Sequence, residues 1–151
     1  MEFADIDAVT VDGYGTLLSL VDPLPALQAA LASRGVERAP AQVRAAFLEE
    51  VAFYKPRSLR GNDAAGLAAL RLECVGVFLE AVGARGSIEP AGFVAAFVGA
   101  LVFEALPGAV AALDDLRRRG IELAMVSNWD CALPQHVERL GLGHLFSTVV
   151  A

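Results

Sequence analysis

The chain has 151 residues, which is enough for one ordinary domain or for a small core that carries an insert. Its net charge is -6 at pH 7, and 56% of its residues are hydrophobic but only 7% are aromatic. An acidic chain does not attract nucleic acid or an acidic membrane surface. The longest run without a charge, residues 90–103, is shorter than the roughly 18 residues that span a membrane. We therefore expect no nucleic-acid partner and no membrane partner.

The N-terminus and the cysteines both point to the cytoplasm. Glu2, Asp5 and Asp7 stand where a secretory signal would carry positive charge and then an apolar run. Cys74 and Cys131 are isolated and lack the spacing of metal ligands, so both are expected to be packing residues in a reducing compartment. The predicted localisation is cytoplasmic.

The first structural element is a short strand that ends on a carboxylate. Residues 9–11 are β-branched and contain no turn residue, which predicts a strand buried on both faces. Asp12 follows, and Gly13 and Gly15 allow the backbone to turn sharply and approach a ligand closely. In open α/β sheets ligands bind outside the carboxyl ends of strands, so Asp12 lies where such an enzyme would keep a nucleophile. The alternative is that Asp followed by Gly simply ends a strand.

Two other glycine-rich motifs do not fit this stretch. A dinucleotide-binding fingerprint would need Gly or Ala at Leu18 and a long helix, whereas the chain runs on to Asp22 and Pro23. A P-loop would need Gly-Lys-Ser or Gly-Lys-Thr after a longer spacer, and the sequence has neither.

From the Asp22-Pro23 hinge to about Leu106 the pattern is helical. Four helices are expected: residues 26–33, a second from Pro40, a third that Asn62 or Asp63 caps and that reaches residue 81, and a fourth over 91–103. Short joints and the lack of a strand pattern predict a small helical bundle.

From Pro107 onward helices and strands alternate. A helix that ends at Arg117-Arg118-Arg119-Gly120, a strand over 121–126, a helix over 133–140 and a strand over 146–150 are predicted. Helices between strands indicate parallel pairing. The predicted fold class is α/β, a Rossmann-like, incomplete parallel sheet core over residues 1–22 and 105–151, with an inserted helical bundle over residues 23–104.

This topology predicts that two polar side chains meet. If the first two strands are parallel neighbours, Asp12 and Ser127 lie at the same edge of the sheet, each after a strand. A carboxylate nucleophile divides a difficult displacement into two easier steps. A serine hydroxyl and nearby backbone N–H groups can hold the oxygens of the transferring group. Without that pairing, Ser127 would be an ordinary turn residue.

On these residues the chain resembles the haloacid dehalogenase-like (HAD) hydrolase superfamily. Asp12-Gly13-Tyr14-Gly15-Thr16-Leu17 is similar to the family's first motif, and Val126-Ser127-Asn128 to its second. The helical stretch between them is similar to the helical cap that the family inserts. The resemblance covers nearly the whole chain.

The resemblance implies roles for six residues. Asp12 is the implied nucleophile, and Ser127 and Asn128 are implied to bind the phosphoryl or carboxylate oxygens together with the loop of Tyr14, Gly15 and Thr16. Mg²⁺ is implied to be held by Asp12 and by the backbone carbonyl of Tyr14. The implied substrate is a small anion.

Tyr14 departs from the family's phosphatases, which usually have a second Asp there as general acid and base. A tyrosine with an ordinary pKa near 10 is a poor acid–base group at neutral pH. Tyrosine at this position is similar to the 2-haloacid dehalogenases, which need neither a protonated leaving group nor a metal. The residues that follow Ser127 look more like a phosphatase-like branch, so both chemistries stay open.

The family's later motifs, a lysine and a pair of acids after the third strand, are not found. The only lysine is Lys55, in the predicted cap, and Asp114-Asp115 precede the second strand. We expect the 151 residues of the chain to be the front part of a longer domain, or a remnant that another chain completes. An open, apolar sheet edge and the apolar residues 91–103 favour a homo-oligomer.

Basic and histidine side chains are weaker candidates. Lys55, Arg57 and Arg60 lie in a predicted cap loop, where they can meet an anionic substrate or simply face solvent. His136 and His144 are expected at the surface or at helix ends.

The sequence therefore predicts a HAD-like hydrolase, a phosphatase that acts on a small phosphorylated metabolite through an aspartyl-phosphate on Asp12 with Mg²⁺. The alternatives are a 2-haloacid dehalogenase-type hydrolase without a cofactor, and a catalytically silent fragment, which is the behaviour expected of residues 1–151 on their own.

Overall fold

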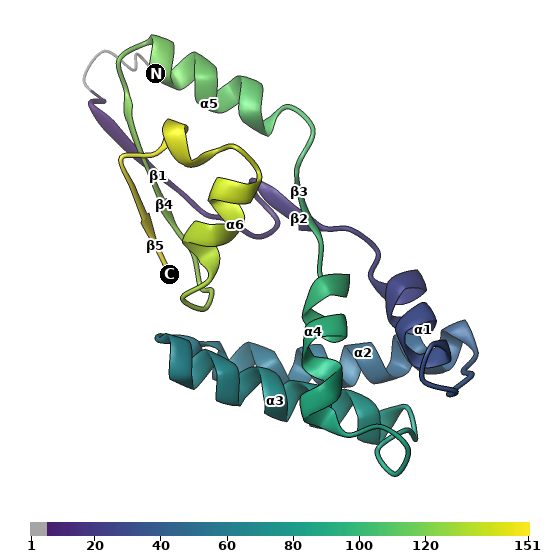
Figure 1. Ribbon diagram of the computed structural model, residues 1–151. Helices are drawn as coiled ribbons and strands as arrows, with labels where there is room; N and C mark the ends of the chain where they lie inside the picture. Colours follow the sequence, from purple (N-terminus) through teal and green to yellow (C-terminus); the bar gives the residue numbers. More distant parts are fainter. Residues whose placement is uncertain (1–5) are drawn as a thin grey trace. The chain divides into compact units, whose positions relative to one another are not determined.

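The computed structural model describes residues 6–151 (Figure 1), so Glu2 and Asp5 lie outside the described residues. The chain divides into two compact units. We call residues 6–19 with 103–151 the sheet unit and residues 20–102 the helical unit. A two-stranded sheet of β2 (Leu18–Leu20) and β3 (Phe103–Ala105) forms where the chain passes from one unit to the other.

The sheet unit contains a parallel sheet, which confirms the α/β fold class. Its strands lie in the order β1 (Ala8–Val11), β4 (Glu122–Val126) and β5 (Thr148–Val150), and both pairings are parallel. Helices α5 (Ala109–Arg118) and α6 (Leu133–Arg139) connect the strands, with a short 3₁₀ turn, η2 (Gly143–Leu145), before β5. Val11 pairs with Met125, so β1 and β4 end side by side.

The apolar core of the sheet unit lies on one face of the sheet. Leu123 and Met125 of β4 are fully buried in a cluster with Leu113 of α5 and with Leu133 and Val137 of α6. Right-handed crossovers that advance in one direction place both helices on the same face. Val126 and Val150, on the other face, are about half exposed.

The prediction that the first strand is buried on both faces is wrong. Val9 and Val11 are half-buried beside Leu123 and Met125, whereas Thr10 is exposed. Because both helices cover the same face, β1 shows the alternation of a strand with one open side.

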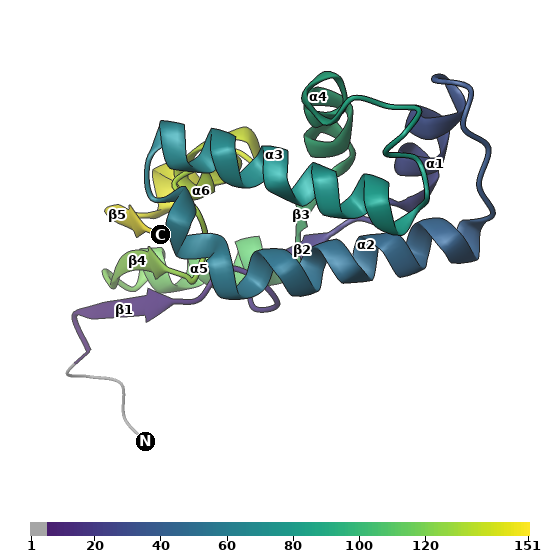
Figure 2. The same cartoon turned by 90° about the horizontal axis from the view of Figure 1, so that it is seen from below.

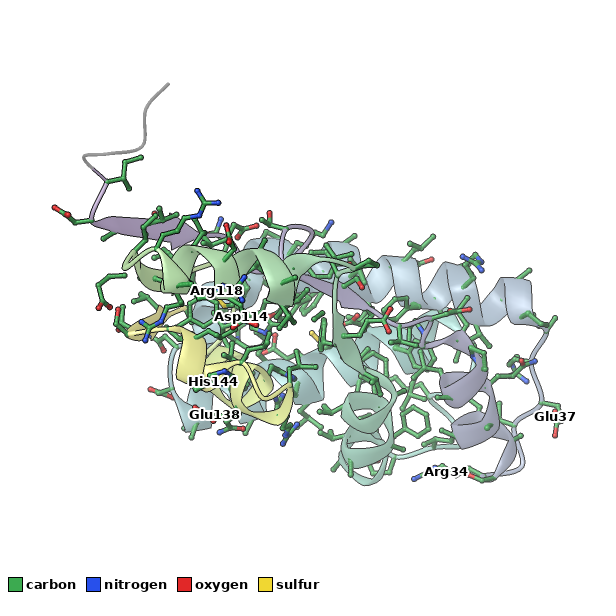
Figure 3. All side chains as sticks on the ribbon, turned by 90° about the horizontal axis from the view of Figure 1, so that it is seen from above. Arg34, Glu37, Asp114, Arg118, Glu138 and His144 are labelled. Atoms are coloured by element: carbon green, nitrogen blue, oxygen red, sulfur yellow. The ribbon has the colours of Figure 1, made fainter. Side chains whose placement is uncertain are left out.

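Helix α5 ends as its charges predict. Arg119 pairs with Asp115 one turn earlier at 2.7 Å, and Gly120 follows with a positive φ of 82°. Arg118, labelled with Asp114 in Figure 3, lies 3.5 Å from Asp115. These exposed pairs contribute little to stability, so the arginine run is a solvated helix end.

The helical unit has four α-helices and one 3₁₀ segment: α1 (Leu24–Ala32), α2 (Pro40–Tyr54), η1 (Lys55–Gly61), α3 (Ala64–Ala81) and α4 (Pro90–Ala100). Helices α2 and α3 lie side by side (Figure 2). Of the two predicted caps, Asp63 is the residue that caps α3, since its carboxylate accepts the N–H of Gly66 at 2.7 Å. Phe78, Phe93 and Phe97 lie at the centre of the core and are almost completely buried.

The predicted helix over 91–103 is wrong at its C-terminal end. Helix α4 stops at Ala100, and Phe103 begins strand β3 instead. Strand β3 forms because β2 lies beside it, and this pairing over more than 80 residues leaves no periodic trace in either short segment. Among residues 6–151, no helix has the length and apolar character that crossing a membrane requires.

Candidate active site

The loop after β1, which we call the nucleophile loop (residues 12–17), folds around one carbonyl. The carbonyl oxygen of Gly13 accepts the N–H groups of Leu17 and Leu18, both at 2.9 Å, and that of Thr16 at 3.3 Å. Gly15 has a φ of 82°, which residues with a side chain rarely adopt. Glycine at position 15 therefore lets the loop close directly behind Asp12.

Gly13 is needed for a different reason. A Cβ atom at this position would lie 3.1 Å from Oγ and 3.2 Å from Cβ of Ser127. The sequence predicted that a glycine here would let the backbone approach a ligand. In the structure the neighbour at this position is Ser127, so the small residue is what allows the two loops to meet.

Asp12 and Ser127, 115 residues apart in the chain, are joined by a hydrogen bond. Ser127 Oγ donates to Asp12 Oδ1 at 2.9 Å, and Thr16 Oγ1 donates to Oδ2 at 3.2 Å. Ser127 is 7% exposed, and its N–H donates to the carbonyl of Val150 at 3.1 Å, which fixes its position at the end of β4. Both oxygens of an exposed carboxylate are thus held by hydroxyl groups.

The other predicted site residues lie around this pair. Tyr14, Gly15 and Asn128 are exposed, and each lies within three residues of Asp12 or Ser127. The structure thus brings all six predicted residues to one edge of the sheet. Their roles in binding and catalysis stay predictions.

An aromatic cluster beside the pair was missed by the sequence analysis. The rings of Tyr14, Phe103, Trp129 and His136 lie with neighbouring centroids 4.9–6.5 Å apart. His136 lies in the last turn of α6, as expected for a helix-end residue, but its ring packs against Phe103 and Trp129. The available signal was Trp129, the only tryptophan, two residues after Ser127.

A buried acid next to the cluster has a structural partner. Asp130 is 7% exposed, and its Oδ1 accepts the backbone N–H of Ala132 at 2.9 Å, just before α6 begins. Within the described part of the chain, no three His, Cys, Asp or Glu side chains form a group that could hold a metal ion.

Two of the three cations of the predicted cap loop already have partners inside the helical unit. Arg60 donates to Glu73 in a two-pronged pair, with Nη1 2.8 Å from Oε2, and this pairing lowers the pKa of Glu73. Arg57 donates to the carbonyl of Phe53 at 2.8 Å and lies 4.0 Å from the centre of its ring. The expected loop is the 3₁₀ segment η1.

Taken together, the sheet unit is of the class of α/β folds with a carboxylate and a hydroxyl at the ends of adjacent parallel strands. Within that class the chain belongs to the haloacid dehalogenase-like hydrolases, because the model of that family matches residues 6–151. This confirms the resemblance seen in the two motifs. No curated protein sequence matches the chain significantly.

Solved structures of this family share the fold. An L-2-haloacid dehalogenase from Xanthobacter autotrophicus is 24% identical with a TM-score of 0.63, over 97% of this chain and 56% of its own. A predicted phosphoglycolate phosphatase from Haemophilus somnus is 19% identical with a TM-score of 0.53, and the match covers 99% of this chain and 64% of the phosphatase. The putative HAD-hydrolase YfnB from Bacillus subtilis, solved with bound magnesium, is 15% identical with a TM-score of 0.61, and the match covers 96% of this chain and 65% of YfnB. The chain therefore spans about three fifths of the length of these proteins.

Proposed function

We propose that the protein is a phosphatase that hydrolyses a small phosphorylated metabolite through an aspartyl-phosphate on Asp12. The observation that carries this proposal is the hydrogen bond of Ser127 Oγ to Asp12 Oδ1 at the ends of two adjacent parallel strands. This bond supports the proposal because it joins a carboxylate that can act as the nucleophile to a hydroxyl group that can bind oxygens of the substrate.

In the first step an oxygen of Asp12 attacks the phosphorus atom. The new bond joins this oxygen to phosphorus, and the bond from phosphorus to the leaving oxygen breaks with its electron pair. Ser127 and Thr16, which hold the carboxylate at 2.9 and 3.2 Å, can turn their hydroxyl groups to the phosphoryl oxygens as charge develops there.

In the second step water attacks the phosphorus of the aspartyl-phosphate, the bond from phosphorus to the Asp12 oxygen breaks with its electron pair, and the proton that water loses goes to solvent. Inorganic phosphate is released and the carboxylate of Asp12 is restored. Tyr14 stands where family phosphatases have their acid–base aspartate, so the leaving oxygen takes its proton from solvent in this proposal. We therefore expect substrates with good leaving groups to react fastest.

The carboxylate of Asp12 and the carbonyl of Tyr14 are hard oxygen donors of the kind that Mg²⁺ prefers. These two groups would hold the ion. When bound, Mg²⁺ neutralises part of the charge on the transferring group.

A second candidate, a 2-haloacid dehalogenase, is favoured by Tyr14. In that reaction Asp12 displaces halide from carbon and forms an ester, which water then hydrolyses, and halide leaves with its electron pair and needs no proton. Tyr14 is then no disadvantage. L-2-haloacid dehalogenases are also among the structures that share the fold.

Two assays on the intact gene product separate the candidates. The phosphatase proposal predicts that an aryl phosphate is hydrolysed with Mg²⁺, that a chelator abolishes this, and that Asp12→Asn removes it. Asp114→Asn, an acid on α5 outside the site, is the matched control and should keep full activity.

The dehalogenase alternative predicts release of chloride from 2-chloropropionate in the presence of a chelator. Chelator-resistant chloride release without phosphate release would overturn the phosphatase proposal. A second phosphatase assay on residues 1–151 alone shows whether these residues are active by themselves.

A further inference from the structure

Trp129 lies at the centre of the aromatic cluster and next to the serine. It is the only tryptophan of the chain and is 9% exposed. Its ring lies 4.9 Å from that of Phe103 in β3 and 5.6 Å from that of His136 in α6. Its backbone N–H donates to the carbonyl of Ser127 at 2.9 Å. The backbone of Trp129 is therefore part of the same turn as Ser127, while its ring packs against Phe103 and His136.

The same ring reaches the nucleophile loop through Tyr14. The two ring centroids are 6.1 Å apart with an interplanar angle of 70°, and Tyr14 meets Phe103 at 6.5 Å and 83°. Edge-to-face arrangements of this kind are the ones that aromatic rings prefer. Tyr14 is 54% exposed, so the cluster holds its ring from one side only.

The nucleophile loop and the Ser127 turn are thus joined by two kinds of contact. One is the hydrogen bond of Ser127 to Asp12, and it involves an oxygen of the reacting carboxylate. Under the proposed function this bond is disturbed when Asp12 is phosphorylated and Ser127 turns to the phosphoryl oxygens. The ring contact of Tyr14 with Trp129 involves no reacting atom, so it persists through both steps.

We propose that Trp129 is a positioning residue that holds the nucleophile loop against the Ser127 turn through the ring of Tyr14 while Asp12 changes its bonding partners. This inference rests on the proposed function for its catalytic consequence. Its structural consequence, the order of the nucleophile loop, does not depend on turnover.

The kinetic test compares two buried aromatic residues of the sheet unit. Trp129→Ala should lower kcat by about 30–100-fold and change KM by less than about 3-fold, because small displacements of reacting groups have large effects on rate. Trp129→Phe should restore kcat to within about 3-fold.

Phe146→Ala is the matched control. Phe146 is also 9% exposed in the same apolar cluster, but it precedes β5 and so lies at the opposite end of the strands from Asp12. The Phe146→Ala substitution should lower the melting temperature while kcat changes by less than about 3-fold. Equal losses of kcat in Trp129→Ala and Phe146→Ala would overturn the proposal.

Amide hydrogen exchange provides a readout that needs no activity. The N–H groups of Leu17 and Leu18 close the nucleophile loop on Gly13, so their exchange reports its opening. In Trp129→Ala they should exchange about 10-fold faster relative to the amides of β4, whereas Phe146→Ala should accelerate both sets together.

If Trp129→Ala does not fold, Tyr14→Ala tests the same contact at a half-exposed position and should accelerate the same two amides. Unchanged relative exchange of Leu17 and Leu18 in the folded variants would overturn the positioning role. Absence of phosphate release from the intact wild-type gene product, with the exchange result as expected, would instead overturn the proposed function alone.

Discussion

The helical unit and the sheet unit differ in how their acidic side chains are buried and hydrogen-bonded. In the helical unit Glu50 of α2 is 5% exposed and hydrogen-bonds with Cys74 of α3, and burial raises the pKa of both groups. In the sheet unit Asp12 is exposed at a strand end, where two hydroxyl groups hold it. Glu50 is enclosed in a folded core, whereas Asp12 is held in place by hydrogen bonds and exposed.

The aromatic side chains differ in the same way. Phe78, Phe93 and Phe97 form a dry centre of the helical unit, and Phe78 and Phe93 are fully buried. The cluster of the sheet unit includes the half-exposed Tyr14 and reaches the nucleophile loop. We infer that substitutions in the first cluster act on stability and those in the second on catalysis.

The largest expected effect is on kcat, and it comes from a substitution of Asp12 that should leave the stability of the fold almost unchanged. Asp12→Asn should lower kcat by at least about 10⁴-fold, since removal of a nucleophile leaves only binding and oxyanion stabilisation. Because Asp12 is exposed, the melting temperature should change by less than about 2 °C. Kinetics with an aryl phosphate and differential scanning calorimetry check both parts, and a loss of kcat smaller than about 10⁴-fold would contradict the first.

Next in size is a cavity in the helical unit. Phe78→Ala removes a fully buried ring and should lower the free energy of unfolding by about 3–5 kcal/mol. Leu48→Ala, at a residue that is 60% exposed on α2, is the control and should change it by less than about 0.5 kcal/mol. Urea unfolding followed by circular dichroism measures both, and similar values for the two variants would be inconsistent with the core described here.

An added methyl group tests the contact between the two loops of the site. Gly13→Ala places a Cβ 3.1 Å from Ser127 Oγ and should destabilise the sheet unit by about 1–3 kcal/mol while reducing kcat. Gly99→Ala in α4 meets nothing within 4 Å and should stabilise the protein by up to about 1 kcal/mol. Thermal unfolding and phosphate release distinguish the pair. Equal stability of the two variants would mean that the close approach is absent.

The smallest effect is a pH dependence that belongs to the helical unit. Folding raises the pKa of Glu50 above its ordinary value of 4.5, mainly through burial. The native state then holds its proton more tightly than the unfolded state. The stabilisation is complete below pH 4.5 and is lost as the pH rises through the pKa of the folded state.

Glu50→Gln should remove this loss of stability and make the protein more stable than wild type at pH 7.5. Glu49→Gln, at the exposed neighbouring position, is the control and should leave the pH profile unchanged. Urea unfolding at pH 5 and pH 7.5 provides the comparison, and a wild-type profile for Glu50→Gln would refute the assignment.

Local features of the fold and site could be predicted from the sequence. Gly15 predicts a sharp turn because a positive φ excludes most other residues, and Asp63 predicts a helix start because its carboxylate can accept a free N–H. The meeting of Asp12 with Ser127 was also predictable, since it follows from parallel pairing of two strands that each end on a polar residue.

The parts that the sequence alone could not predict all depend on contacts between distant segments. Periodicity shows that a segment is buried but not which segment covers it, so Phe103 was placed in a helix and β2 was missed. The same limit applies to the aromatic cluster, in which Trp129 meets rings from three other segments.

By itself, then, the sequence determined the α/β class, the carboxylate at the end of the first strand and the family motifs. Only the tertiary structure decided that both helices cover one face of the sheet, that Gly13 makes room for Ser127, and that Trp129 joins the two loops of the site. The physical reason is that backbone preferences act over a few neighbouring residues, whereas packing partners are chosen when the whole chain closes on itself.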